Sequence, residues 1–418
     1  MGEGIPTDHR VLTSTVRSLA MLSLHTSPLT QPGAGDSGGM NVYVRELVSS
    51  LAQAGVHTTV FTRRTAAEVP EVVEVEPGFR VVHVDAGPLD LPKASLGEVV
   101  DTYADGVLGH LRRGHPVDAL HANYWLSGVA GHRLKHELDR PLVCTFHTLA
   151  RVKAEVGDRE PAGRIQAEGE TIGCADVICA SSHTEAAQLR RLYDAPSGRL
   201  EVVPPGVDHA FFSPGDQRGD RAALGLGDHP VLLFVGRIQP LKGLTVAVEA
   251  LAMLGRDDAV LVVVGGPSGP DGRREERRAH KLAAELGVAD RVRFVEPQPH
   301  HLLSTYYRAA DLCVVPSRSE SFGLVALEAA ACGTPVVAAA VGGLRTLVEH
   351  GETGFLVEGR EPAVFAAYAD ELLANPDLAR TMSAQAAEGA GSYRWSTTAA
   401  RLRRIYADLT VRSLVQCA

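Results

Sequence analysis

Short runs of apolar residues alternate along the chain with longer segments in which apolar residues recur every three or four positions. The first pattern is typical of buried strands and the second of amphipathic helices. Their alternation predicts parallel sheets with helices on both faces. The predicted strands form two series, over residues 19–24, 58–62, 80–84, 119–121, 142–146, 177–180 and 200–203, and then 231–235, 260–264, 292–294, 312–315 and 336–339. The predicted fold class is α/β, with two doubly wound domains. Their ligands are expected beyond the carboxyl ends of the strands, in a cleft between the domains.

Two helices have clear limits in the sequence. A predicted helix over 40–54 buries an apolar stripe and ends at Gly55. Another is expected to start near Ser182, because Glu185 follows it at the spacing of a capping box.

The length of 418 residues suits two cores of about 200 residues each. Prolines, glycines and acidic residues after position 203 mark a boundary between the two series of strands. We therefore expect a loose tail over 1–17, a first Rossmann-like domain over 18–208, a linker over 209–228 and a second Rossmann-like domain over 229–395.

Composition narrows the classes of function. The chain is 45% hydrophobic and 22% charged, as globular proteins are, and its formal net charge of -9 argues against non-specific binding to nucleic acid. No apolar run approaches the roughly 20 residues that a membrane helix needs, and residues 1–17 lack the apolar core of a secretory signal. We therefore expect a cytoplasmic protein without an integral membrane segment.

The six cysteines, at positions 144, 174, 179, 313, 332 and 417, are scattered and form no Cys-x-x-Cys pair. Most of them lie in apolar strand or helix contexts. This pattern favours small buried residues in a reducing compartment over disulfides or a metal cage, so no metal site is predicted.

The most informative motif is Pro316-Ser-Arg-Ser-Glu-Ser-Phe-Gly-Leu-Val-Ala-Leu-Glu328. It places Glu320 on a loop and Glu328 on an apolar helix that is expected to start near Phe322. The free N–H groups at the start of such a helix form an anion site suited to a diphosphate. Glu328 would then contact a ribose hydroxyl, and Glu320 would contact the hydroxyls of a sugar. One element would thus bind all three parts of a nucleotide sugar. A capped helix with two surface acids is the alternative.

A glycine-rich loop follows the first predicted strand. Gly38 and Gly39 lack a Cβ atom, so backbone N–H groups there can approach a phosphate closely; a plain tight turn is the alternative. Gly35-Asp-Ser-Gly-Gly39 also matches the nucleophile loop of chymotrypsin-like serine proteases. Those proteins are all-β and place the catalytic His and Asp well before the Ser, whereas only 36 residues precede Ser37 here. We therefore reject a protease.

Charged and polar side chains follow two further strands. Arg237 and Lys242 stand after the strand at 231–235, on either side of a turn. Two cations at a strand end suit a diphosphate whose charge grows as its glycosyl bond breaks, although two unrelated surface cations would give the same pattern. His147 directly follows the carboxyl end of the strand at 142–146. This position, together with the other motifs, favours a catalytic role for His147 over a structural one.

Together these elements resemble the retaining group-1 glycosyltransferases of the GT-B fold, over about residues 18–410. The resemblance implies a nucleotide-sugar-binding second domain and an acceptor-binding first domain. It also implies a segment over 396–418 whose helix, at about 397–409, crosses back to the first domain. No cofactor is implied, because cations and helix N-termini handle the diphosphate; Mg²⁺ is expected to help only weakly. The implied catalytic residues are His147, Arg237, Lys242 and Glu320, and the implied donor-binding residues are Gly38, Gly39, Asn41, Arg237, Lys242, Glu320, Ser321, Phe322, Gly323, Leu324 and Glu328.

A closer resemblance is carried by the first half. The runs 25–29, 35–44, 124–128 and 147–153 are similar to those of the D-inositol-3-phosphate glycosyltransferases that start mycothiol synthesis. That family moves N-acetylglucosamine from UDP-GlcNAc to inositol 3-phosphate with retention of configuration, and a homodimer is implied by close relatives. The implied acceptor-binding residues are His25, Lys93, Tyr124, Thr148 and Arg164. Two cations and two hydroxyls among them suit a phosphomonoester.

Departures from the family pattern leave other acceptor substrates as alternatives. His121-Ala-Asn-Tyr124 stands where the family usually has His-Ser-His-Tyr, Thr145-Phe-His147 replaces Ala-x-His, and no Asn follows Lys153. Sucrose-phosphate synthases share part of the pattern. A paralogue acting on another sugar phosphate or on a natural-product acceptor is an alternative, as is a protein that binds nucleotide sugars without turnover.

Overall fold

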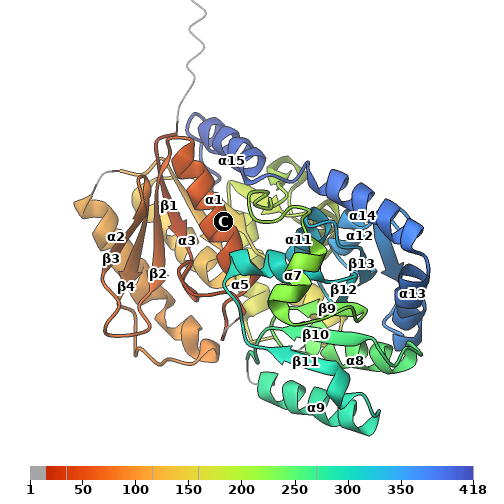
Figure 1. Cartoon of the computed structure of the whole chain (residues 1–418). Coiled ribbons are helices and arrows are strands. Elements are labelled where there is room, and N and C mark those ends of the chain that lie inside the picture. The colour runs from red at the N-terminus through yellow and green to blue at the C-terminus, as the bar shows by residue number, and fades with distance from the viewer. Residues whose placement is uncertain (1–15, 34, 115, 159, 270, 418) are drawn as a thin grey trace, which may run out of the picture.

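The structure is a computed structural model that describes residues 16–33, 35–114, 116–158, 160–269 and 271–417. Two α/β units lie side by side, each built on one twisted sheet (Figure 1). Of the predicted tail over 1–17, only Val16 and Arg17 are among the described residues.

Within the described residues, the first sheet has eight strands in the order β3-β4-β2-β1-β5-β6-β7-β8. All neighbours in it are parallel except β3, which runs antiparallel to β4 at one edge. The strands are β1 (Ser18–Leu22), β2 (His57–Arg63), β3 (Val72–Glu76), β4 (Phe79–Val84), β5 (Ala119–Asn123), β6 (Leu142–Thr145), β7 (Val177–Ala180) and β8 (Leu200–Val202).

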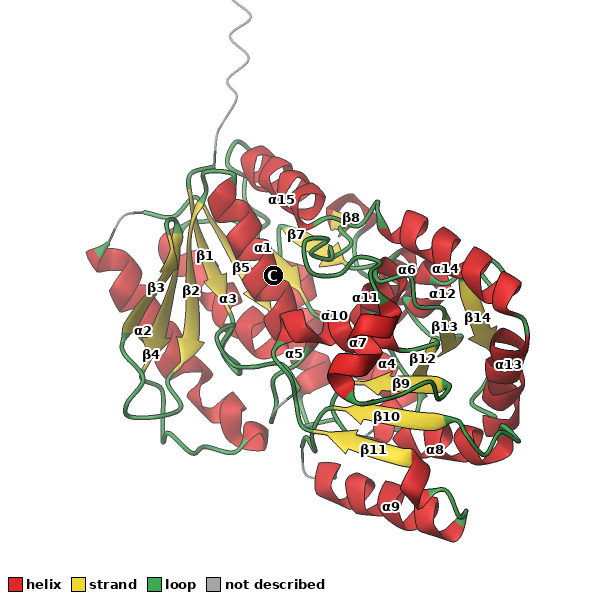
Figure 2. Cartoon of the chain, viewed as in Figure 1, coloured by secondary structure: helices red, strands yellow, loops and turns green. Residues whose placement is uncertain are grey.

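Helices cover both faces of this sheet (Figure 2). One buried apolar cluster joins a face of the sheet to α2, α3, α5 and α6, and another joins the opposite face to α1 and α15. The final helix, α15, thus returns to the first unit and packs on α1. The helices are α1 (Gly39–Gln53), α2 (Val100–Arg113), α3 (Trp125–Leu138), α4 (Ala150–Glu155), α5 (Arg164–Cys174), α6 (His183–Tyr193) and α15 (Trp395–Leu409), with short 3-10 turns at Lys93–Val99 and Ser197–Arg199.

The second sheet is parallel throughout, in the order β11-β10-β9-β12-β13-β14. Its strands are β9 (Val231–Val235), β10 (Val260–Val264), β11 (Val292–Val295), β12 (Leu312–Val315), β13 (Val336–Ala339) and β14 (Gly354–Val357). Helices α8, α9 and α13 pack on one face and α10 and α11 on the other, while α14 contacts both α13 and α11. The helices are α7 (Gln217–Leu224), α8 (Leu244–Met253), α9 (Gly272–Glu285), α10 (Leu303–Ala309), α11 (Leu324–Ala331), α12 (Leu344–Leu347), α13 (Pro362–Ala374) and α14 (Pro376–Ala390), with 3-10 turns at Pro240–Lys242, Ala289–Arg291 and His300–Leu302.

Most predicted elements are present, and the differences have local causes. Helix α11 begins at Leu324 rather than near Phe322, because Gly323 stands before it with φ of +104°. The predicted set lacks the edge strands β3 and β14, and the segment predicted as a linker contains α7. The domain boundaries themselves stay predictions. Among the described residues, no helix combines the length and the apolar character needed to cross a membrane.

The prediction that the cysteines form no disulfide is wrong. Cys174 and Cys417 are joined, with their Cα atoms 5.0 Å apart and a separation of 243 positions in sequence. The pairing follows from the return of the segment after α15 to the first unit, and local spacing carries no sign of it. The remaining cysteines, Cys144, Cys179, Cys313 and Cys332, are free and buried as predicted.

Candidate active site

The loops that follow β1, β5, β6, β9 and β12 border one cavity of about 340 Å³ between the two units. The predicted residues that line it are His25, Gly38, Gly39, Asn41, Lys93, Tyr124, His147, Thr148, Arg237, Lys242, Glu320, Ser321, Phe322, Gly323, Leu324 and Glu328. The described lining does not include Arg164, which lies behind it. Residues chosen from distant motifs are therefore brought together, as expected for ligands at the carboxyl ends of parallel strands.

Two helix N-termini meet in this cavity. Helix α1 begins at Gly39 and α11 at Leu324, and a Cβ atom on Gly39 would lie 3.4 Å from Cδ1 of Leu324. A Cβ atom on Gly38 would lie only 2.9 Å from Nε of Arg237, so the close approach of the loop to this guanidinium depends on a glycine. The first N–H groups of both helices lack intrahelical partners. Together with Arg237 they form an anion site.

Asn41 holds the glycine loop in shape. Its side-chain oxygen accepts the Gly38 N–H at 2.9 Å, and its Nδ2 donates at 2.6 Å to both Thr26 Oγ1 and the Ser27 carbonyl. The sequence resemblance implies a contact with the donor. In the structure, the side-chain amide is used within the protein, so the contribution of Asn41 to the site is to position the loop.

The two predicted diphosphate cations have protein partners. Lys242, in the 3-10 turn after β9, pairs with Glu320, whose Oε1 also accepts from Ser317 Oγ at 2.8 Å. Arg237 Nη1 donates to the Asp36 carbonyl at 3.3 Å. Burial lowers the pKa of Arg237, and the charges of Asp36 and Glu320 act in the opposite direction. A guanidinium nevertheless stays protonated at neutral pH, so Arg237 keeps its positive charge.

Glu328 is buried, yet both of its carboxylate oxygens are held. His300 Nε2 lies 2.7 Å from one oxygen, and the Tyr307 hydroxyl donates to the other at 2.9 Å. Burial alone would lower the pKa of His300, but the charge of Glu328 reverses the effect and raises it. Neither His300, in the 3-10 turn after β11, nor Tyr307, in α10, was predicted, because no spacing in the sequence ties these segments to α11.

His147 has an unusual backbone. Its φ is +61°, a conformation that residues with a side chain rarely adopt and that often marks functional sites. Its Nε2 lies 2.9 Å from Asn123 Oδ1, and its carbonyl accepts a hydrogen bond from the Ser321 hydroxyl across the cavity. Burial, followed by the charge of His121, lowers the pKa of His147 to about 3, so the ring is neutral at physiological pH.

His121 is a second buried histidine, and the pH dependence of stability tests whether it stays neutral in the folded protein. Burial lowers its pKa to about 3, and its ring nitrogens lie 2.6 Å from the Tyr406 hydroxyl and 2.8 Å from Thr145 Oγ1. In the unfolded chain, His121 has its ordinary pKa and takes up a proton as pH falls below about 6.5, whereas in the native chain it stays neutral. The free energy of unfolding therefore decreases as pH falls through this range. Between about pH 7.5 and pH 5.5, the unfolding free energy of the native protein should fall by about 1.4 kcal/mol more than that of His121→Gln. Urea unfolding at both pH values measures the free energy of unfolding of each protein. An equal decrease in the two proteins would contradict the prediction.

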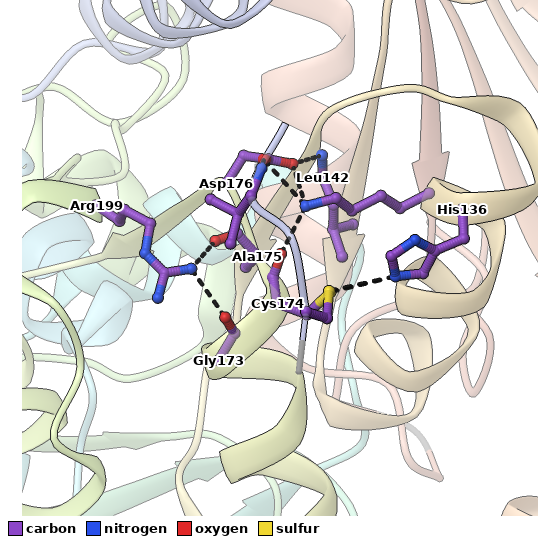
Figure 3. The surroundings of a disulfide bond; sticks show 10 residues. His136, Leu142, Gly173, Cys174, Ala175, Asp176 and Arg199 are labelled. Carbon is purple, nitrogen blue, oxygen red and sulfur yellow. Dashed lines mark hydrogen bonds and ion pairs between the residues drawn. A yellow bond between two sulfur atoms is a disulfide. The ribbon is translucent and has the colours of Figure 1, made fainter. Parts of the chain in front are cut away.

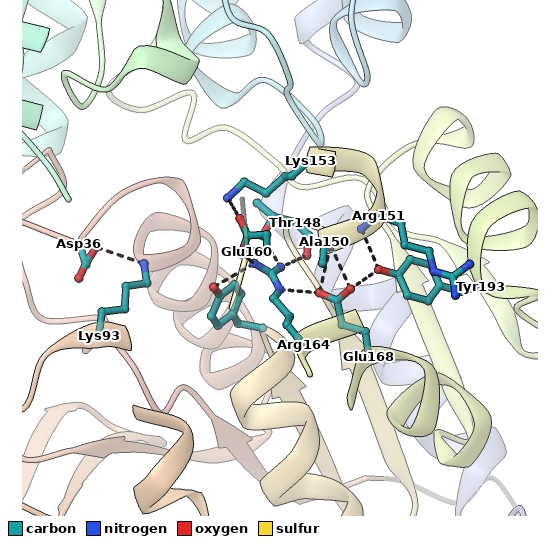
Figure 4. A network of polar contacts seen from close by, with 11 residues as sticks. Asp36, Lys93, Thr148, Ala150, Arg151, Lys153, Glu160, Arg164, Glu168 and Tyr193 are labelled. Carbon is teal, nitrogen blue, oxygen red and sulfur yellow. Dashed lines mark hydrogen bonds and ion pairs between the residues drawn. The ribbon is translucent and has the colours of Figure 1, made fainter. Parts of the chain in front are cut away.

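Two lysines bring positive charge to the first-unit side of the cavity (Figure 4). Lys93 Nζ lies 3.1 Å from Asp36, and Lys153 pairs with Glu160. Burial lowers the pKa of Lys93, and Asp36 opposes that effect. Lys153 was not predicted as a site residue; its place in the run 147–153, five residues after Thr148, was the available signal.

His25 and Tyr124 pack ring on ring, with centroids 4.3 Å apart. Tyr124, like His147, has a positive φ, of +75°. Burial, and then the charge of Lys93, lowers the pKa of His25 well below its usual value. Among the described residues, Nδ1 of His25 is buried without a hydrogen-bond partner. Buried polar atoms are rarely left unpaired, so this nitrogen stands out as an unused hydrogen-bonding group of a residue that lines the cavity.

The family resemblance implied that Arg164 binds the acceptor, but Arg164 is the first residue of α5 and is fully buried. Its Nη2 donates to the carbonyl and Oγ1 of Thr148 at 2.9 and 3.0 Å, and its Nη1 to the Tyr124 hydroxyl at 3.3 Å. Glu160 and Glu168 pair with the same guanidinium. In the structure Arg164 therefore holds Thr148 and Tyr124 from behind rather than lining the cavity.

Comparison with known proteins identifies the family. Models of a glycosyl transferase 4-like domain and of glycosyl transferases group 1 match residues 38–206 and 216–389. The D-inositol 3-phosphate glycosyltransferase of Thermobispora bispora is 47% identical over 411 residues, covering 95% of this chain and 96% of the relative. The chain belongs to this glycosyltransferase family. The predicted resemblance to group-1 enzymes is thereby confirmed.

Solved structures agree on the fold. Sucrose-phosphate synthase from Thermosynechococcus elongatus superposes with a TM-score of 0.89 at 35% identity, covering 94% of this chain and 99% of that one. HepE from Anabaena, solved with UDP-glucose, gives a TM-score of 0.74 at 21% identity, covering 94% and 100%. The GT-B fold is confirmed, and the chain is a glycosyltransferase.

Proposed function

We propose that this glycosyltransferase moves N-acetylglucosamine from UDP-GlcNAc to 1D-myo-inositol 3-phosphate with retention of configuration. The observation that carries the proposal is the two-sided cavity. An anion site at two helix N-termini with Arg237 and Lys242 shares it with a second cationic group around Lys93 and Lys153. One phosphorylated substrate on each side accounts for both groups. The name of the relative from Thermobispora bispora supports the acceptor, and the UDP-glucose complex of HepE supports a uridine donor.

On the donor side, Arg237, Lys242 and the first N–H groups of α1 and α11 would bind the diphosphate. Glu328, oriented by His300 and Tyr307, would accept hydrogen bonds from the ribose. Lys242 would exchange Glu320 for a phosphate oxygen, which frees Glu320 to hold the sugar hydroxyls. Charge stabilisation by fixed cations is greatest as the diphosphate leaves, so these groups would act mainly on turnover.

The chemical step proposed for the retaining group uses front-face attack. The bond between the anomeric carbon and the diphosphate oxygen breaks, and an inositol hydroxyl forms a new bond to that carbon on the same face. The proton of the hydroxyl passes to the departing diphosphate, giving UDP and the glycoside. His147 is neutral and its carbonyl is held by Ser321, so it would orient sugar hydroxyls and the reacting carbon rather than supply charge.

The two units already touch around this site. Ser181 and Ser182 reach the Ser321 carbonyl at 3.2 and 3.4 Å, and Gln31 donates to the Pro297 carbonyl at 2.7 Å. A closed arrangement of this kind would exclude water and limit hydrolysis of the donor. No metal is needed in the proposed step, and adding Mg²⁺ is expected to change the rate only weakly. We also propose a cytoplasmic homodimer, by resemblance to the family.

A product assay tests the proposal. UDP-GlcNAc and UDP-glucose would each be offered with inositol 3-phosphate, and the products read by mass spectrometry and by the anomeric proton coupling. An α-linked N-acetylhexosamine-inositol phosphate is the expected product. A product from UDP-glucose alone would favour the alternative of a sucrose-phosphate-synthase-like enzyme, which the 35% identity to such a protein motivates. Donor binding by calorimetry with no product from any acceptor would favour a non-catalytic protein.

A further inference from the structure

Four side chains of metal-binding type gather on the first unit. His132 and His136 stand one turn apart on α3, Cys174 ends α5, and Cys417 follows α15. One potential ligand atom from each lies within 4.8 Å of the other three. Nε2 of His136 is 3.5 Å from the sulfur of Cys174 and 3.2 Å from that of Cys417. The described lining of the active-site cavity includes none of the four, so this cluster belongs to a different place in the molecule.

The backbone that carries these side chains is fixed by a buried polar network (Figure 3). The Asp176 carboxylate accepts the Val415 N–H at 2.7 Å and pairs with Lys135 at 2.9 Å. It therefore ties the neighbour of His136 to the segment that carries Cys417. Arg199 donates to the carbonyls on either side of Cys174, those of Gly173 and Ala175, at 3.0 and 2.6 Å. Lys135 also donates to the carbonyl of Cys174 itself at 2.8 Å.

We propose that, when Cys174 and Cys417 are reduced, this cluster binds one Zn²⁺ through two thiolates and two imidazoles. Structural zinc takes four such ligands in a tetrahedron, with bonds of about 2.3 Å to sulfur and 2.0–2.1 Å to nitrogen. Ligand atoms in that tetrahedron are about 3.3–3.8 Å apart, which the cluster approaches. Histidines one helical turn apart are a common zinc spacing, and thiolate with imidazole favours zinc over magnesium or calcium.

The disulfide and the zinc site would be alternative states of the same residues. A dithiol reductant would cleave the bond between the two sulfurs, leaving two thiols and an oxidised reductant. Zinc would then displace the two thiol protons. The sulfurs must separate to about 3.8 Å for zinc. Cys417 can make this movement locally, because residues 413–417 are in no helix or strand. In both states the segment after α15 is fastened to α3 and α5.

Cobalt is the probe for this site. The full-length protein would be reduced with a dithiol, freed of it under nitrogen, and titrated with Co²⁺ alone. About one equivalent should give sulfur-to-cobalt charge-transfer absorption and the visible bands of a tetrahedral ion, and Zn²⁺ should abolish both. Cys417→Ser and His136→Ala should each weaken binding by about tenfold or more. Gln416→Ala, beside Cys417 and outside the cluster, should bind as the native chain does.

The outcomes separate a metal site from a disulfide alone. The oxidised protein should give four free thiols after denaturation, since the chain has six cysteines, and should not produce the charge-transfer band. Circular dichroism would show that each reduced variant keeps its fold. A folded, reduced native protein without the band would overturn the proposal. So would an unchanged band in the double variant Cys417→Ser/His136→Ala. In either case the cluster would be a disulfide site only.

Discussion

Replacing Lys242 with alanine is expected to lower the turnover number about 100-fold or more, a loss of about 2.7 kcal/mol in transition-state stabilisation. The physical reason is that Lys242 faces the cavity beside the N-terminus of α11 and is proposed to meet the charge that grows on the leaving diphosphate. Steady-state kinetics with saturating donor and acceptor measure the effect. Because the charge grows during the reaction, turnover should fall more than donor affinity does.

Two comparisons make this test specific. Lys281→Ala removes an exposed lysine of α9 that pairs with Glu285, and it should leave the rate unchanged. Loss of Lys242 also leaves Glu320 without its cation. The double variant Lys242→Ala/Glu320→Gln should therefore stay as slow as the single one. A turnover number near the native value in Lys242→Ala would remove the leaving-group role.

Arg164→Ala is expected to damage both stability and acceptor use. The guanidinium is fully buried and pairs with Glu168, which is equally buried, and with Glu160. Removing one partner of a buried ion pair costs about 3–5 kcal/mol, because the remaining charge is left without compensation. In a domain of this size that corresponds to a fall of about 10 °C in Tm, measurable by calorimetry.

The effect on catalysis should be selective. Without Arg164, the hydroxyls of Thr148 and Tyr124 lose their common donor, so the KM for a phosphorylated acceptor should rise. Slow hydrolysis of the donor should stay as it is, because it does not use these groups. Arg151→Ala, which removes an exposed arginine of α4 next to the Tyr193 ring, is the matched control. An unchanged KM in a folded Arg164→Ala protein would contradict the positioning role.

The parts of the fold that the sequence predicts well are those in which one physical signal dominates. The central strands β9, β10, β12 and β13 are buried on both faces and read as continuous apolar runs. The edge strand β3 alternates acidic and apolar residues and is partly exposed, so its signal is weak. The motifs at strand ends were informative because a parallel sheet brings the carboxyl ends of its strands together.

Contacts set by tertiary structure were beyond prediction. Glu160 and Glu168 stand four residues before and after Arg164, so these ion pairs have a local spacing, but the burial of the guanidinium depends on how α5 packs on its neighbours. The contact between His300 and Glu328 joins a loop after β11 to α11, and the disulfide between Cys174 and Cys417 spans 243 residues. The contact between His300 and Glu328 and the disulfide leave no local pattern, because each partner stands in a segment that would look ordinary alone.

The most direct test of the proposed function compares kcat/KM for inositol 3-phosphate with that for plain inositol, using UDP-GlcNAc as donor. Lys93 and Lys153 would each contribute a charge-assisted contact of about 1.5–3 kcal/mol, so the native enzyme should prefer the phosphorylated acceptor about 10²–10⁴-fold. In Lys93→Ala/Lys153→Ala the preference should collapse while the slow reaction with inositol persists. A native enzyme that uses both acceptors equally, or a double variant that keeps the full preference, would contradict the acceptor site described above.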